Sequence, residues 1–177
     1  MDGLVGSEMC IRDSFQTMVA DLTNLDIANA SLLDEPTAAA EAMTLAHRSS
    51  KSKSDTFLVD KNCFPQTVSI VKARAKPLGI NVEVVDLNEF NANEAFGALF
   101  QYPGNDGSVE ISTELLAPLK DKGIITIAAT DLLALTLIKA PGDLGFDIAI
   151  GNSQRFGVPL GFGGPVSYTH LTLPTMS

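Results

Sequence analysis

The sequence predicts an α/β fold: a mostly parallel sheet flanked by helices. Short β-prone runs alternate with segments of helical composition, and each run is bounded by Gly, Pro, Asn or Asp. Such alternation implies βαβ units, with helices on both faces of the sheet. The chain has 177 residues, of which 45% are hydrophobic and 19% charged, so it can bury a core and is expected to form one domain.

The predicted elements follow one another in regular order. We expect buried parallel strands at residues 57–59, 82–85, 98–100, 124–128 and 148–150. The helical segments lie at residues 35–48, 65–76, 111–122 and 131–138. Pro65 suits a first helical turn, while Lys120 and Lys122 stand where the C-terminus of a helix favours cations.

Charge and composition exclude several classes of protein. The 21 acidic and 12 basic residues give a net charge of −9, which argues against a nucleic-acid binder. The basic run at residues 48–54 is interpreted as a charged helix end that enters a solvated loop. The most apolar stretch, residues 123–138, is interrupted by Asp131 and is too short for a membrane helix.

The cysteines and the ends indicate a reducing compartment. Cys10 and Cys63 are too few for a disulfide framework and have no partner at metal-ligand spacing. The N-terminus lacks the order of segments that a secretory signal requires, so we expect a cytoplasmic protein without a membrane span.

Residues 1–14 and 166–177 are expected to lie outside the fold. Neither segment shows a periodicity that continues into its neighbour, and both are similar to translated adapter DNA at the ends of assembled environmental sequences. Genuine disordered termini are the alternative. The body, residues 15–165, ends within a Gly-rich run, which predicts a fragment of a longer protein.

The start of the first predicted helix offers a possible anion site. Asp34 and Glu35 precede Thr37 and a run of small residues, and a helix N-terminus attracts phosphate through its free N–H groups. Capping alone also explains the two acids, and their carboxylates would repel an anion.

Two later segments could also carry chemistry. Asp131 follows an apolar strand, so it lies either at the ligand-binding edge of a parallel sheet or at the start of the next helix, as its cap. Residues 151–165 contain five Gly and two Pro, which suits a shaped loop over a pocket or an interface. By contrast, His47 is interpreted as a surface or cap residue, and Cys63 as inert.

Residues 29–43 and 151–159 resemble the P-protein family of the glycine cleavage system, the decarboxylating glycine dehydrogenases, and the resemblance covers residues 15–165. It implies the aspartate-aminotransferase fold type of pyridoxal-phosphate enzymes. The family decarboxylates glycine and transfers the aminomethyl group to the lipoyl arm of the H-protein. Two related halves make up the enzyme, and only the second carries the cofactor lysine. This chain resembles part of the large domain of the first half.

The resemblance also assigns positions within a vestigial cofactor pocket. Gln154 and Arg155 stand where the active half has a His-Lys pair, Asp131 where it has the carboxylate for the pyridine nitrogen, and Thr37 where its phosphate loop lies. An arginine stays protonated and cannot form the internal Schiff base, and Gln has no ring to stack on a pyridine. We therefore expect no catalytic residue, bound cofactor or metal in this chain. We expect Arg155 to hold the Gly-rich loop through hydrogen bonds to backbone carbonyls or to a carboxylate such as Asp131.

The implied partners are the second half or second subunit of the P-protein and the lipoyl H-protein, in a homodimer or heterotetramer. The compartment would be the bacterial cytoplasm or, in a eukaryote, the mitochondrial matrix. Two alternatives remain open: a separate non-catalytic subunit of a split P-protein, and another pyridoxal-phosphate enzyme, which would need a lysine just after Asn152.

Overall fold

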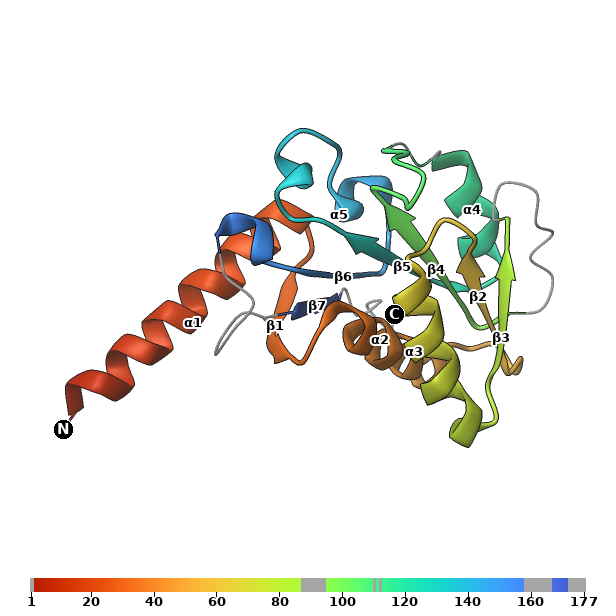
Figure 1. Ribbon diagram of the computed structural model, residues 1–177, viewed down its shortest axis with the longest axis horizontal. Helices are drawn as coiled ribbons and strands as arrows, with labels where there is room; N and C mark the ends of the chain where they lie inside the picture. The colour runs from red at the N-terminus through yellow and green to blue at the C-terminus, as the bar shows by residue number, and fades with distance from the viewer. Residues whose placement is uncertain (1, 87–94, 110, 112, 158–166, 172–177) are drawn as a thin grey trace.

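A computed structural model describes residues 2–86, 95–109, 111, 113–157 and 167–171. The strands of this part of the chain form one seven-stranded sheet in the order β1-β7-β6-β5-β4-β2-β3 (Figure 1). The strands are β1 (Ile27–Leu32), β2 (Thr56–Asp60), β3 (Asn81–Val85), β4 (Gly97–Tyr102), β5 (Ile125–Thr130), β6 (Ile148–Asn152) and β7 (Ser167–Leu171). The helices are α1 (Asp2–Thr23), α2 (Glu35–Ser49), α3 (Pro65–Ala75), α4 (Thr113–Asp121) and α5 (Pro141–Leu144), with short 3₁₀ turns η1 (Lys76–Leu78), η2 (Ala134–Thr136) and η3 (Gln154–Phe156).

The five strands from β2 to β6 are mutually parallel wherever they pair, as the sequence predicts. β7 runs antiparallel to both of its neighbours, β6 and β1. The fold class is therefore confirmed, and all five predicted strands are present with small shifts of their ends.

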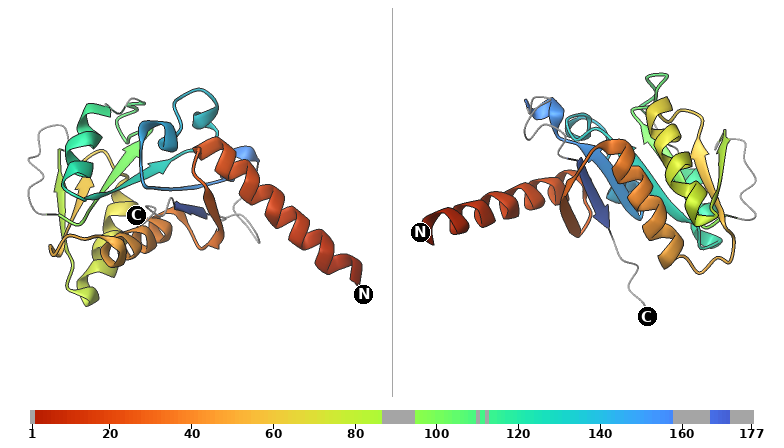
Figure 2. Two further views of the ribbon diagram at one scale, coloured as in Figure 1. Left: turned by 180° about the vertical axis from the view of Figure 1, so that it is seen from behind. Right: turned by 60° about the horizontal axis from the view of Figure 1, so that its bottom comes forward.

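Helices cover both faces of the sheet. Alternate residues of a strand point to opposite faces, so one strand contributes to two separate cores. Phe57 and Val59 pack in the core under α2 and α3, whereas the intervening Leu58 packs in the opposite core with Val19 of α1 and Leu116 of α4. The helices α2 and α3 lie side by side on their face, and the N-terminal part of α1 extends away from the sheet (Figures 1 and 2).

Helix α2 begins where the sequence predicts. The Asp34 side chain accepts a hydrogen bond of 2.8 Å from the Thr37 N–H, and Pro36 occupies the first turn, where its missing N–H costs nothing. The alanines of this helix are fully buried and allow a close approach to the sheet. A Cβ on Gly97 would lie 3.3 Å from the Ala46 Cβ, so the missing side chain of this glycine lets β4 lie close to α2.

Three predictions about the elements need correction. The predicted helix at 131–138 is only a turn with the three-residue η2, because Asp131 bonds the local Leu133 N–H. Residues 166–177 were expected outside the fold, yet Ser167–Leu171 pair on both sides as β7. Tyr and Thr suit a strand, and the open edge of β6 provides its partner. At the other end, α1 is helical from Asp2 onward, although residues 1–14 showed no continuing periodicity.

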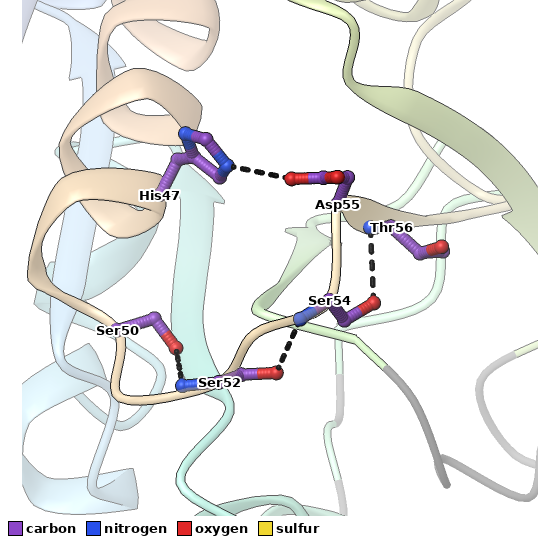
Figure 3. Close-up of polar contacts among 6 residues, drawn as sticks. All are labelled: His47, Ser50, Ser52, Ser54, Asp55 and Thr56. Carbon is purple, nitrogen blue, oxygen red and sulfur yellow. Dashed lines mark hydrogen bonds and ion pairs between the residues drawn. The ribbon is translucent and has the colours of Figure 1, made fainter.

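The connection between α2 and β2 is ordered by its own side chains (Figure 3). The hydroxyls of Ser50, Ser52 and Ser54 accept hydrogen bonds of 3.1, 3.2 and 3.1 Å from the N–H groups two residues further on. His47 Nε2 lies 3.2 Å from Asp55 Oδ1, across the two ends of the connection. The basic run is thus a helix end and loop, as predicted.

None of the helices in the described part of the chain is both long and apolar enough to span a bilayer.

Candidate functional site

Polar side chains converge at the carboxyl ends of the three central strands. Gln101 belongs to β4, Thr130 to β5 and Asn152 to β6, and Glu35 stands beside them as the first residue of α2. Because parallel strands end at one edge of the sheet, side chains far apart in sequence meet there, and this is the edge where α/β proteins bind ligands.

Two adjoining cavities open at this edge. The first has a volume of about 310 Å³ and is lined by Glu35, Phe64, Gln101, Pro103, Thr130, Asp131, Asn152, Gln154 and Arg155. The second, of about 280 Å³, is lined by Asp34, Glu35, Pro36, Phe64, Gln66, Thr67, Asn152 and Gln154. Glu35 and Phe64 therefore border both cavities.

The carboxyl group of Glu35 is the central ionisable group of this site. Asn152 Nδ2 donates a hydrogen bond of 2.7 Å to Glu35 Oε2. Burial raises the pKa of Glu35 above its usual range, and the negative charges of Asp131 and Asp34 raise it further. Glu35 therefore binds its proton more tightly than a surface glutamate does.

Asp131 serves both roles that the sequence left open. Its Oδ1 accepts a hydrogen bond of 3.0 Å from the Leu133 N–H, which is the capping role in a short turn. Its Oδ2 lies 3.1 Å from Arg155 Nη1, at the ligand-binding edge of the sheet. The predicted pairing of Arg155 with this carboxylate is present, although the Arg155 side chain is 65% exposed.

The N-terminus of α2 does not offer the phosphate site that was considered for it. The Thr37 N–H is already bonded to Asp34 Oδ1, and Pro36 has no N–H. The Glu35 carboxyl group also lies at this end of the helix. Of the two hypotheses for this segment, capping accounts for its geometry.

Three of the four residues assigned to the vestigial pocket lie together. Asp131, Gln154 and Arg155 line the first cavity, whereas Thr37 lines neither cavity. The sequence does not mark Gln101 and Thr67 as site residues, because an isolated Gln in a strand or Thr in a helix belongs to no motif. The position of Glu35 at a helix start predicts a capping acid, and its burial and its bond from Asn152 depend on the assembled strands.

The other two candidates lie outside this site. The His47 ring contacts Phe96 edge-on, with ring centroids 4.7 Å apart, and faces Asp55. Cys63 is buried, and burial raises the pKa of its thiol, which agrees with an inert residue. Within the described ranges, no group of three or more His, Cys, Asp or Glu is placed to hold a metal ion.

A model of the family described as glycine cleavage system P-protein matches residues 12–171. The chain belongs to the glycine cleavage system P-protein family. It is 57% identical over 152 residues to the glycine dehydrogenase (decarboxylating) of Dechloromonas aromatica, and 59% identical over 152 residues to that of Cereibacter sphaeroides strain KD131. In both comparisons the match covers 86% of this chain but 16% of the relative, so the chain spans about one sixth of these P-proteins.

Solved structures agree with the P-protein fold. A glycine decarboxylase (P-protein) of the glycine cleavage system, in inhibitor-bound form, superposes with a TM-score of 0.79 and 31% identity, over 89% of this chain and 37% of that one. A cystathionine gamma-lyase from Lactobacillus plantarum, complexed with L-serine, gives a TM-score of 0.71 at 15% identity, over 91% of this chain and 42% of that one. The second likeness concerns the fold alone.

The described residues that line the two cavities do not fit pyridoxal phosphate. Lysine is absent from the described residues that line the two cavities, so the amine for a Schiff base is missing there. A phosphate group in these cavities would meet the carboxyl groups of Asp34 and Glu35, and Arg155 is already paired with Asp131. The chemistry of these side chains favours a donor of hydrogen bonds over an anion.

Proposed function

We propose that this chain is part of the first half of a glycine-decarboxylating enzyme, in which it supports the active half and forms interfaces. The complete enzyme would decarboxylate glycine with pyridoxal phosphate held by its other half, and would transfer the aminomethyl group to the lipoyl group of the H-protein. The identity of 57–59% to glycine dehydrogenases supports this assignment.

One observation carries the non-catalytic role. The residue at the Schiff-base position is Arg155, and its guanidinium pairs with Asp131 at 3.1 Å. A guanidinium stays protonated at physiological pH and cannot act as the amine nucleophile. In this proposal Asp131, Gln154 and Arg155, which line the first cavity, are the remains of a cofactor pocket, and the chain contributes no catalytic residue.

The partners follow from the same role. The second half of the P-protein, in the same chain or as a second subunit, would complete the active site, and the H-protein would deliver its lipoyl arm to that site. We place the assembly in a homodimer or heterotetramer in the bacterial cytoplasm. Residues 1–14 and 166–177 would be foreign flanks of a native segment at 15–165, even though part of the second flank occupies a strand position.

Reductive trapping of the cofactor tests the assignment. The 177-residue chain and the complete enzyme are each incubated with pyridoxal phosphate, treated with borohydride and digested for mass spectrometry. We expect a stoichiometric lysine adduct in the complete enzyme, outside the region that matches this chain, together with release of labelled CO₂ from carboxyl-labelled glycine.

A single stoichiometric lysine adduct within residues 15–165 would contradict the non-catalytic role. An enzyme that binds the cofactor but releases no CO₂ from glycine would contradict the proposed reaction. Arg155→Lys provides the matched variant: it should remain free of adduct at position 155, because the carboxyl groups of Asp34 and Glu35 still disfavour the phosphate.

A further inference from the structure

Three buried oxygen atoms around the two cavities have no hydrogen-bond partner within the described part of the chain. They are Glu35 Oε1, Gln101 Oε1 and Thr67 Oγ1. The Gln101 side chain lines the first cavity and the residue is only 4% exposed, while Thr67 lines the second and is fully buried. A buried polar atom without a partner costs roughly 1–3 kcal/mol, so such atoms indicate a missing ligand or solvent.

The charges at these atoms determine what such a ligand must be. When Glu35 is ionised, its unpaired oxygen and the amide oxygen of Gln101 only accept hydrogen bonds. The carboxylates of Asp34 and Asp131 add negative charge, and the guanidinium of Arg155 is directed to Asp131. A ligand that donates hydrogen bonds and carries a positive charge satisfies this site, whereas an anion would be repelled.

A primary ammonium group matches these requirements better than a metal ion. It presents three N–H donors, and Phe64 on the border of both cavities offers an aromatic ring, a favourable neighbour for a cation. A divalent cation such as Ca²⁺ needs six or more oxygen ligands, and the residues described here contain no metal-binding cluster.

We propose that the cavities beside Glu35 bind primary ammonium groups of small molecules, with the Glu35 carboxylate as charge partner. Gln101 Oε1 is the further acceptor in the first cavity, and Thr67 Oγ1 is the further acceptor in the second. The site lies at the sheet edge where Asp131, Gln154 and Arg155 line the first cavity, and its charges disfavour an anion. This proposal does not depend on the reaction proposed above.

Titration with methylammonium tests the site in the 177-residue chain. The probe signals in NMR are the Thr67 methyl group and the side-chain amides of Gln101 and Asn152. We expect saturable shifts of these signals at millimolar methylammonium. Tetramethylammonium, which has the charge but no N–H donor, should bind at least about tenfold more weakly. Equal binding of the two cations, or the absence of saturable shifts, would overturn the proposal.

Three variants separate the site from a general effect of charge. Glu35→Gln removes the charge with little change of shape and should weaken methylammonium binding by about tenfold or more. Glu83→Gln, on the distant edge strand β3, is the matched control and should bind like the unchanged chain. Should Glu35→Gln fail to fold, Thr67→Val removes only an unpaired hydroxyl and must also weaken binding. Unchanged affinity in either site variant would overturn the proposal.

The same titration in the complete enzyme, with its cofactor removed, identifies the source of the ammonium group. A small-molecule site predicts that the Thr67 methyl signal again shifts with methylammonium. Binding to the 177-residue chain without binding to the complete apoenzyme would show that another part of the enzyme fills the cavity, and the small-molecule site would be wrong.

Discussion

Glu35 is a buried acid whose protonation is coupled to folding. Because its pKa is raised above 4.5 in the folded state, the native protein binds this proton more tightly than the unfolded chain does. The corresponding stability is present below pH 4.5 and is lost as the pH rises through the folded-state pKa. A neutral side chain at position 35 would not have this loss.

Glu35→Gln should therefore become more stable relative to the unchanged chain as the pH rises from below 4.5 toward neutrality. Urea denaturation at a series of pH values measures this difference, without added amines. The two proteins should have similar stabilities at the lowest pH, which serves as the internal control. A difference that is constant with pH would show that Glu35 is not protonated preferentially in the native state.

The ion pair between Arg155 and Asp131 should contribute little to stability. Because Arg155 is 65% exposed, we expect a coupling energy of about 0–1 kcal/mol that decreases with salt. A double-mutant cycle of Arg155→Gln and Asp131→Asn measures it, and the Asn side chain can still accept from the Leu133 N–H. A coupling well above this range would mean that the pair is shielded from solvent.

Residues that belong to a motif can be identified from the sequence, whereas residues whose role depends only on packing cannot. The Arg155–Asp131 pair could be anticipated because a guanidinium near a carboxylate at a sheet edge forms a pair. Gln101 and Thr67 are ordinary residues until the fold buries them beside Glu35. Their role depends on segments that lie more than 30 residues apart in the chain.

Repeated hydrogen bonds from backbone N–H groups to serine hydroxyls stabilise the connection from α2 to β2. The triple variant Ser50→Ala, Ser52→Ala and Ser54→Ala removes the hydroxyl acceptors shown in Figure 3 and should lower the free energy of unfolding by about 1 kcal/mol. The effect is small because the freed N–H groups can bond water. Lys51→Ala with Lys53→Ala is the matched control, since both lysines are exposed.

Thermal or urea denaturation compares the two variants. Equal destabilisation by the lysine control would show that the charges, and not the serine hydroxyls, order this connection.

Elements with a strong pattern could be predicted, and elements with a weak one could not. β4 is buried along its whole length, and apart from Gln101 its sequence, Gly-Ala-Leu-Phe-Gln-Tyr, is mostly apolar. β1, with the sequence Ile-Ala-Asn-Ala-Ser-Leu, lacks a run of large apolar residues, and only its pairing with β7 makes it a strand. Residues 131–138 have helical composition, but the local bond from Leu133 to Asp131 holds a turn there instead.

For the whole molecule, the two flanks should differ in their effect on stability. Removal of residues 166–177 takes away β7 and leaves β1 without its partner, so we expect loss of cooperative unfolding. A domain has only about 5–15 kcal/mol of total stability, and β7 pairs with two strands. Removal of residues 1–12 should change little, since this part of α1 extends away from the sheet (Figure 2).

Circular dichroism during thermal unfolding compares these two truncations. A truncation at the C-terminal end that unfolds as cooperatively as the full chain would show that β7 contributes no stability in solution.

The fold class was predictable because alternating strands and helices leave few arrangements, and a parallel sheet covered on both faces satisfies them. The place of β7 was not predictable, because residues 166–177 carry no signal that links them to β1 at the other end of the chain. Pairing across that separation depends on the sheet edge that the intervening elements create.

The pairing of β1 with β7 also has a kinetic consequence. Ile27 pairs with Leu171, and among the described strands β1 pairs only with β7, which is synthesised much later. Contacts between such distant segments form slowly, because a long loop must close first. The parallel strands β2 to β6 can pair before β7, the partner of β1, has been synthesised. In refolding followed by pulsed hydrogen exchange, amides of β1 should gain protection after those of β4 and β5, and simultaneous protection would contradict this order.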